Sequence, residues 1–188
     1  GKSTFARFLG EKLDKDVYHL DRFFWKPGWE RTEPDEWKRI VNELISKDEW
    51  IIDGNYSGTL KDRAMRSDLI YFFDYSSVFC LYRIFKRIFK SKMQLEDRSD
   101  ISDGCLERWF DWEFVDFVRT FNEKIRPRVY SILEEISFNK NNLVINITAE
   151  SQGLEIAKKH LPSILDRLPA SPLPAPKGEP SLKPVLAG

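Results

Sequence analysis

The sequence predicts an α/β fold in which a mainly parallel sheet lies between layers of helices. Short apolar runs, each bounded by polar residues, alternate along the chain with segments of helical periodicity. Such an alternation is typical of parallel strands joined by crossover helices that cover both faces of the sheet. The 188 residues, of which 41% are hydrophobic, suit one domain with one core.

The apolar runs and the helical patterns can be placed in order along the chain. Pro34 suits a first helical position, and Pro127 is expected to break or bend the helix in which it lies. Strands are predicted at 17–20, 50–53, 69–74 and 143–147. Helices are predicted at 3–13, 34–46, 59–66, 77–90, 111–136 and 151–161.

The end of the chain differs in composition from the rest. Seven of the ten prolines fall between Pro162 and Pro184, without apolar periodicity. A segment of this kind buries too little surface to offset the entropy lost when it is ordered. The sequence therefore predicts a folded domain at 1–161, with a lid at about 91–107, and a Pro-rich, disordered tail at 162–188.

Charge, cysteines and hydropathy argue against several classes of protein. Thirty basic and thirty acidic residues cancel, so no field of the whole molecule would draw it onto nucleic acid or membrane. Cys80 and Cys105 are too few and too far apart for a disulfide framework or a zinc site. The sequence has no run of about 18 apolar residues that would predict a membrane span. We expect a cytoplasmic protein with reduced thiols and no membrane partner.

The first residues carry a motif for phosphate binding. Gly1, Lys2, Ser3 and Thr4 match the second half of the phosphate-loop pattern, GxxxxGK followed by Ser or Thr, and a predicted helix follows. In such a loop, backbone amides hold phosphate oxygens, the lysine reaches the β- and γ-phosphates, and the next hydroxyl binds Mg²⁺. The four residues are therefore candidates for ATP binding, and Ser3 for Mg²⁺. We expect the chain to begin inside this loop; a capped surface helix is the alternative.

Together with further segments, the motif resembles the family of DNA topology modulation proteins called FlaR, a group similar to adenylate kinases. The resemblance covers about residues 1–160. It is carried by segments whose order and spacing match as well as their composition, namely GKST from Gly1, HLDRFFWKPGW from His19, DEWIIDGNYSGTL from Asp48, RSDLIYFFD from Arg66, CLYRIFKR from Cys80, DGC from Asp103 and IRPR from Ile125.

The resemblance implies a P-loop nucleotide kinase-like fold of three layers, α/β/α, with five parallel strands. The first strand of that fold, which is central, would be missing from this chain. Its place would lie between the strand that ends at Asp53 and the strand that ends at Asp74. We therefore expect two unpaired strand edges and a gap in the core.

Two carboxylates stand at the ends of predicted strands, where open parallel sheets gather their ligands. Asp21 is a candidate for orienting a Mg²⁺-bound water or an acceptor hydroxyl, and a surface turn is the alternative. Asp53 is a candidate for holding Mg²⁺ through water, and a turn cap is the alternative. The segment after Asp53 resembles the Asp-Gly segment of adenylate kinases, which places Asn55, Tyr56 and Arg63 toward the phosphoryl acceptor.

Basic residues recur three to four positions apart in the helix predicted at 77–90. They form a stripe opposite apolar positions and comprise Arg83, Lys86, Arg87 and Lys90. The resemblance implies that this helix leads into the lid, and that Arg83 and Arg87 close on the transferring phosphates. A solvated basic face is the alternative, and contact with nucleic acid or lipid is a further one.

Two other arginines are candidates for substrate contacts. Arg98 lies in the polar lid segment, and Arg126 precedes Pro127 at the predicted helix break. Ordinary surface arginines are the alternative. A group of aromatic residues is interpreted as cover for the core, with stacking on a base as the alternative, and consists of Phe23, Phe24, Trp25, Trp29 and Trp37.

Two functions follow from these candidates. The first is an ATP-dependent, Mg²⁺-requiring phosphotransferase of the adenylate kinase-like class, which acts on a nucleotide or another small molecule. Its catalytic residues would be Lys2, Asp21, Asp53, Arg83 and Arg87. The second is a nucleotide-dependent, DNA-associated regulator of topology with little kinase activity. The neutral net charge counts against strong affinity for DNA.

Overall fold

The structure is a computed structural model and describes residues 1–92, 112–140, 143–148, 162 and 183–187. Its helices are α1 (Lys2–Leu13), α2 (Asp21–Phe24), α3 (Pro34–Ile45), α4 (Ser57–Arg66), α5 (Ser77–Lys92), α6 (Trp112–Lys124) and α7 (Arg126–Lys140). Its strands are β1 (Val17–His19), β2 (Trp25–Lys26), β3 (Glu30–Arg31), β4 (Ile51–Asp53), β5 (Leu69–Phe73), β6 (Leu143–Ile147) and β7 (Pro184–Ala187).

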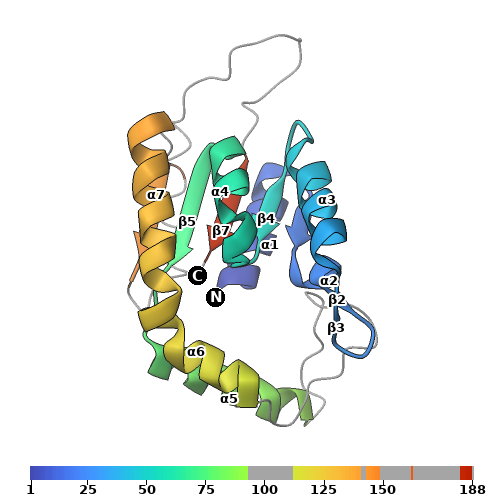
Figure 1. Ribbon diagram of the computed structural model, residues 1–188, viewed down its shortest axis with the longest axis vertical. Coiled ribbons are helices and arrows are strands. Elements are labelled where there is room, and N and C mark those ends of the chain that lie inside the picture. Colours follow the sequence, from blue (N-terminus) through green and yellow to red (C-terminus); the bar gives the residue numbers. More distant parts are fainter. Residues whose placement is uncertain (93–111, 141–142, 149–161, 163–182, 188) are drawn as a thin grey trace.

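These elements form an α/β fold with a parallel five-stranded sheet, so the prediction of an α/β class with a mainly parallel sheet is confirmed. Helix α1 covers one face of the sheet, and α3, α4 and α7 cover the other (Figure 1). Helices α5 and α6 lie beyond the carboxyl ends of the strands (Figure 1). Among the described residues, no helix combines the length and the apolarity that crossing a bilayer would require.

The predicted strands and helices that lie among the described residues agree with the structure to within a few residues, except that one helix is divided and that α2, β2, β3 and β7 were not predicted. The helix predicted at 111–136 is two helices, because the chain breaks at Ile125, just before Pro127. A short antiparallel hairpin of β2 and β3 was not predicted. The helix predicted at 151–161 and most of the lid, from residue 93 onward, lie outside the described residues.

The centre of the sheet corrects a prediction. The strand order is β1-β4-β7-β5-β6, and β7 runs parallel to both of its neighbours. The expectation of two unpaired edges and a gap between β4 and β5 was therefore wrong, because Pro184–Ala187 fills that place. The expectation of a disordered tail is wrong for these residues as well, although 163–182 lie outside the described part of the chain.

The local sequence explains how β7 fits a central position. Val185 and Leu186 have no exposed surface. These two adjacent apolar side chains pack on opposite faces of the sheet. Pro184 stands first in the strand, where the missing N–H disturbs the ladder least. The strand is also joined to the start of β5 by the side chain of Asp68, whose Oδ2 accepts from the backbone N–H of Lys183 at 3.0 Å.

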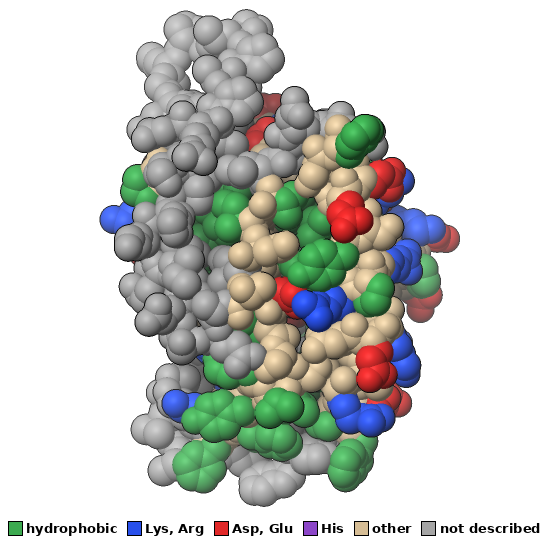
Figure 2. Space-filling view, turned by 90° about the vertical axis from the view of Figure 1, so that its left-hand side faces the viewer, with side chains coloured by type: hydrophobic (Ala, Val, Ile, Leu, Met, Phe, Trp, Pro, Cys, Tyr) green, Lys and Arg blue, Asp and Glu red, His purple; other side chains and the backbone are tan. Residues whose placement is uncertain are grey.

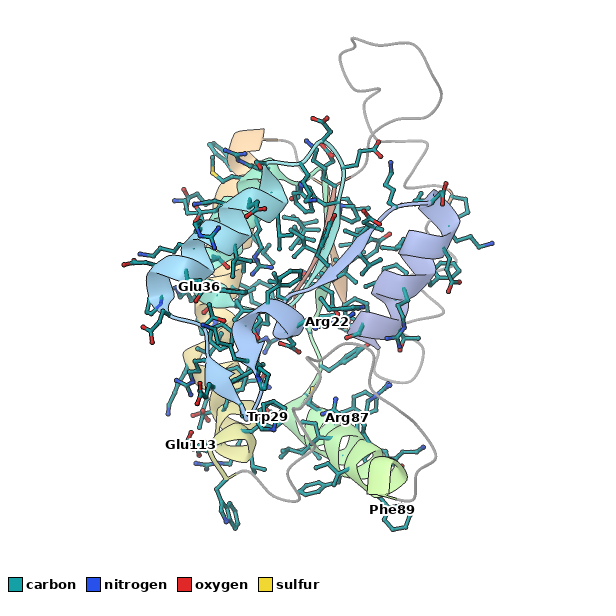
Figure 3. The ribbon with its side chains drawn as sticks, turned by 90° about the vertical axis from the view of Figure 1, so that its right-hand side faces the viewer. Arg22, Trp29, Glu36, Arg87, Phe89 and Glu113 are labelled. Carbon is teal, nitrogen blue, oxygen red and sulfur yellow. The ribbon has the colours of Figure 1, made fainter. Side chains whose placement is uncertain are left out.

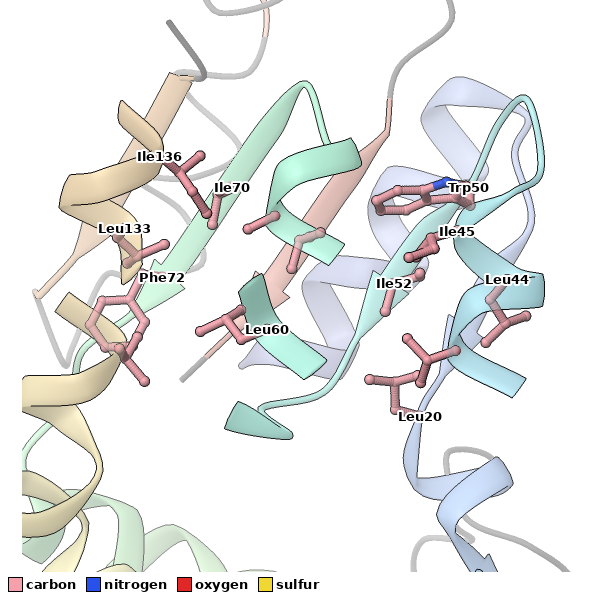
Figure 4. Close-up of a cluster of buried hydrophobic side chains, with 14 of the residues drawn as sticks. Leu20, Leu44, Ile45, Trp50, Ile52, Leu60, Ile70, Phe72, Leu133 and Ile136 are labelled. Carbon is pink, nitrogen blue, oxygen red and sulfur yellow. The ribbon is translucent and has the colours of Figure 1, made fainter. Parts of the chain in front are cut away.

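Alternate residues of the strands face two separate apolar clusters, as a period of two requires. One cluster joins the sheet to α3, α4 and α7, and its labelled members are Leu20, Leu44, Ile45, Trp50, Ile52, Leu60, Ile70, Phe72, Leu133 and Ile136 (Figure 4). The other joins the sheet to α1 and contains Phe5, Ala6, Leu9, Ile51, Leu69, Tyr71, Phe73 and Leu186. Both clusters thus depend on β7, since Val185 belongs to the first and Leu186 to the second.

Candidate functional site

The predicted site residues Lys2 and Asp53 meet at the carboxyl edge of the sheet. Helix α1 begins at Lys2, and β4 ends at Asp53. Lys2 Nζ lies 2.8 Å from Asp53 Oδ1, with side-chain exposures of 23% and 4% respectively. The backbone N–H groups of the first turn of α1 have no partner within the helix and point toward its positive end. A cation and these amide groups therefore lie beside one buried carboxylate.

His19 completes the arrangement, and the sequence analysis did not single it out as a site residue. It ends β1 directly opposite Asp53 in the parallel register, and its Nδ1 lies 2.9 Å from Asp53 Oδ2 in a buried setting. An ionised carboxylate only accepts hydrogen bonds, so Nδ1 carries the proton. The sequence places both residues near the ends of predicted strands, but only the register between β1 and β4 shows that they face each other.

The environment of Asp53 keeps its carboxyl group ionised. Burial by itself raises the pKa of this carboxyl, but the positive charge of Lys2 and hydrogen bonds from His19, Lys2 and Ser3 outweigh burial and hold the pKa well below its usual range. Ser3 therefore lies within reach of Asp53, as expected for two candidate Mg²⁺ ligands. Thr4, the next residue of the motif, is exposed on the first turn of α1.

The loop after Asp53 is held in place by its glycine and by a buried arginine. Gly54 has a φ of +150°, and a Cβ built on it would lie 2.7 Å from Leu20 Cβ, so no other residue fits without strain. Arg63 has no exposed surface. It donates from Nη1 to the Gly54 carbonyl and from Nη2 to the Tyr56 carbonyl, each at 2.9 Å. The structure thus places Arg63 beneath the loop rather than toward an acceptor.

The acceptor candidates Asp21 and Tyr56 are hydrogen-bonded to each other. Tyr56 Oη donates to Asp21 Oδ1 at 2.6 Å. Burial first, and then the charge of Asp21, raise the pKa of Tyr56 far above its usual range, so the phenol stays neutral. Its ring packs against Phe24 at 4.6 Å and against Trp37 at 4.8 Å between centroids. These two aromatic residues belong to the core, as the sequence analysis interpreted them.

Asn55 carries a polar atom without a partner. Its Oδ1 is buried and accepts no hydrogen bond in the structure. An unpaired buried acceptor of this kind is costly and favours the arrival of a donor, such as a water or a hydroxyl group. Asn55 follows Asp53 by two positions and precedes Tyr56, so it lies between the two halves of the candidate site.

The charges of Arg83 and Arg87 reach the mouth of α1. The α-amino group of Gly1 has its pKa lowered to about 6, by burial first and then by the positive charges of Arg83, Lys2 and Arg87. Figure 3 shows Arg87 on the side of α5 that faces the rest of the molecule, whereas Phe89 points away from it. The Arg83 guanidinium also lies 5.7 Å from the centre of the Phe79 ring. These two predicted residues are therefore brought to the same region as Lys2.

Arg126 is bound to an acidic side chain of the fold. Its Nη2 donates to Asp74 Oδ2 at 2.5 Å, and Tyr130 Oη donates to the same oxygen at 2.6 Å. The Asp74 side chain is 3% exposed and that of Arg126 is 41% exposed. This cluster joins the end of β5 to the start of α7. Arg98, the remaining substrate candidate, lies outside the described residues.

The surface of the described residues has two further features. A hollow of about 370 Å³ lies at the far end of α1, where Gly10, Asp14 and Val17 are among its lining residues, so it is separate from Lys2 and Asp53. Apolar side chains gather at the lower end of the molecule, where α5 and α6 lie (Figure 2). The exposed ones on these two helices are Val78, Tyr82, Phe85, Phe89, Trp112, Phe114 and Phe117.

Comparisons of the chain with family models, with curated proteins and with solved structures found no match. The function must therefore be argued from the geometry of the site itself.

Proposed function

We propose that this protein binds a Mg²⁺-nucleoside triphosphate at the start of α1 and transfers the terminal phosphoryl group to a small acceptor, as adenylate kinase-like phosphotransferases do. The observation that carries the proposal is the 2.8 Å ion pair between Lys2 at the helix start and Asp53 at the strand end. A phosphate site needs a cation and free amides at one place, and a metal-bound phosphate also needs a carboxylate.

The charge balance at the mouth of α1 suits a polyanion. Lys2, Arg83 and Arg87 all act on the α-amino group of Gly1, and the carboxylate of Asp53 acts on it with the opposite sign. Oriented cations and amides in a partly buried site stabilise the charge that spreads over a transferring phosphoryl group. Each of these groups would therefore contribute both to binding the triphosphate and to the transfer step.

The Mg²⁺ that accompanies the triphosphate finds suitable oxygen atoms. Ser3 supplies a hydroxyl, and Asp53 supplies a carboxylate that accepts a hydrogen bond from it. Among the described residues, no three His, Cys, Asp or Glu side chains converge on a point that could hold a metal by themselves. Magnesium in phosphate sites takes most of its ligands from water and phosphate, so one hydroxyl and one carboxylate fit this ion.

The pair of Asp21 and Tyr56 provides an acceptor site. The Tyr56 hydroxyl donates to Oδ1 of Asp21, and Asp21 starts α2 at the carboxyl edge of β1. Its second oxygen, Oδ2, is the group that would accept the proton of an attacking hydroxyl as the P–O bond forms. The buried Oδ1 of Asn55 offers a further acceptor for a hydroxyl or a water in this region.

The same observations weigh against the alternative of a DNA-associated regulator. Arg83 and Arg87 direct their charge toward Gly1, and α5 exposes Val78, Tyr82, Phe85 and Phe89 together with Arg83 and Lys86. A DNA-binding face would instead expose rows of Lys and Arg. No observation in the described part of the chain favours DNA over a small polyanion.

The proposal is tested by calorimetric titration of the protein with MgATP, followed by incubation with γ-labelled ATP, Mg²⁺ and a panel of nucleoside monophosphates and small alcohols. We expect binding and a labelled acceptor. Lys2→Met should abolish both, whereas Lys12→Met, at the exposed far end of the same helix, should leave both unchanged. Absence of MgATP binding would refute the proposal, and salt-sensitive retention of DNA without labelled product would support the alternative.

A further inference from the structure

The Asp53 carboxylate is held at both of its oxygens, and the two donors differ in how easily they can leave. Lys2 binds Oδ1 through a long, flexible side chain that is 23% exposed. His19 binds Oδ2 through a ring that is 9% exposed. The backbone fixes the His19 side further, because Leu20 N–H donates to the Asp53 carbonyl at 2.8 Å. Lys2 can therefore leave the carboxylate more easily than His19, which is paired with Asp53 across the sheet.

A bound triphosphate would compete with the Asp53 carboxylate for Lys2. In the proposed function, Lys2 turns to the β- and γ-phosphates, which carry more negative charge than one carboxylate. Oδ1 then loses its partner in a place where burial disfavours the charged form of Asp53. The direct donors that remain are His19 and Ser3. Of these two, His19 is the one that lies in register with Asp53 across the sheet.

We propose that His19 is a positioning residue, which holds Oδ2 of Asp53 so that Oδ1 faces the Mg²⁺ of the bound nucleotide once Lys2 has moved to the phosphates. The inference rests on the proposed function, because it concerns the same site. It assigns His19 no contact with the substrate. It explains why a histidine stands at the end of β1 with its ring turned toward a carboxylate rather than toward solvent.

The chemistry of the contact selects the variants for a test. The hydrogen bond needs one N–H at the position of Nδ1, and the amide nitrogen of asparagine can place an N–H there. His19→Asn should therefore keep most of the function, and His19→Ala should lose it. Tyr18→Phe is a matched control, since Tyr18 precedes His19 on the same strand and the hydroxyl that the substitution removes makes an exposed hydrogen bond to Asp16, at 3.3 Å.

The first measurement is the affinity for ATP with Mg²⁺ and with excess EDTA. We expect His19→Ala to weaken MgATP binding about 10-fold or more, as loss of an outer partner of a metal ligand does. Its affinity for metal-free ATP should stay within about 2-fold of the wild-type value, because Lys2 and the amides of α1 are untouched. His19→Asn and Tyr18→Phe should follow the wild type. Equal losses with and without Mg²⁺, or no loss at all, would overturn the inference.

The second measurement follows the imidazole itself and does not require a variant. Long-range ¹H–¹⁵N NMR spectra of His19 should show a protonated Nδ1 in the free protein and after addition of MgATP. A proton that leaves Nδ1 in either state would overturn the inference even if the variants failed to fold. The failure of the two proposals can be told apart, because a wild-type protein that binds no MgATP refutes both, whereas normal binding by His19→Ala refutes this one alone.

Discussion

Lys2 and Asp53 are 51 residues apart in the sequence, yet Lys2 Nζ lies 2.8 Å from Asp53 Oδ1. The pair joins two layers of the fold, because Lys2 begins α1 and Asp53 ends β4. It also sets the chemistry of the site, since a buried carboxylate would otherwise favour its protonated form. Several of the predictions below test groups that meet at this edge of the sheet.

The first prediction concerns pH. The pKa of Asp53 is held well below its usual range in the folded protein, so the carboxylate stabilises the fold above the unfolded-state value of about 4. This stabilisation is lost as the pH falls from about 4 toward the folded-state pKa. In urea unfolding at a series of pH values, the free energy of unfolding of the wild type should therefore be larger than that of Asp53→Asn at pH 7. The difference in free energy of unfolding should shrink below about pH 4. A constant difference down to pH 3 would contradict this account.

The second prediction concerns the acceptor side. Asp21→Asn removes the oxygen that would accept a proton from the attacking hydroxyl, so kcat for phosphoryl transfer should fall by about 100-fold or more. The affinity for MgATP should remain close to the wild-type value, because the carboxylate of Asp21 is held by Tyr56 on the acceptor side. Asp62→Asn on the exposed side of α4 is the control. Parallel loss of MgATP binding would place Asp21 in the phosphate site instead.

The third prediction concerns the loop glycine. Gly54→Ala should lower the free energy of unfolding by about 1–3 kcal/mol, because φ is +150° and the new Cβ would meet Leu20 Cβ at 2.7 Å. Gly58→Ala is the matched control, since its Cβ would meet no atom within 4 Å. Gly58 lies in α4, where alanine should stabilise the helix by about 0.5–1 kcal/mol. In thermal or urea unfolding, Gly54→Ala should lower the free energy of unfolding and Gly58→Ala should raise it.

The fourth prediction concerns the cluster at the end of β5. Arg126→Ala leaves the nearly buried Asp74 with Tyr130 as its donor. The free energy of unfolding should fall by about 1–2 kcal/mol, a figure reduced for the exposure of the arginine. Arg128→Ala, two positions further on and exposed, should change stability by less than about 0.5 kcal/mol. Equal effects of the two substitutions would show that the Asp74 contact does not stabilise the fold.

The fifth prediction concerns the central strand. Leu186 has no exposed surface and packs against α1, so Leu186→Ala should cost about 2–5 kcal/mol in urea unfolding. Phe138→Ala is the control, because that large apolar side chain is 90% exposed on α7. Truncation of Phe138 should change the free energy of unfolding little. A small effect of Leu186→Ala would mean that the place between β4 and β5 is not filled as the structure has it.

The layered fold could be predicted because its signal is local. The strands that end at Asp53 and Phe73 are buried along their whole length and consist of apolar residues except for Asp53 itself, as expected for strands covered on both faces. The place of β7 could not be predicted, since Pro184–Ala187 is a four-residue strand behind a proline-rich segment. Its assignment depends on partners more than a hundred residues away, and local patterns carry no information about them.

The candidate site was predicted in part for a similar reason. Lys2 and Asp53 were found because each stands at a recognisable point, a helix start and a strand end. Arg63 was assigned to the acceptor because the segment after Asp53 resembles that of adenylate kinases, but it is buried beneath the loop, with its pKa lowered to about 10 by burial. His19 was missed because its role depends on the register between β1 and β4, which a single strand does not reveal.

The central position of β7 has a consequence for how quickly this protein can assemble. Its first contact with β5 joins Asp68 to Lys183 across 115 residues, and closing so long a loop must precede most of the stabilisation that the pairing brings. Helices such as α3 form from neighbouring residues and need no such search. The rate of folding is therefore expected to depend on the pairing of β7 with β4 and β5. Until that pairing forms, β4 and β5 expose unpaired edges that favour aggregation.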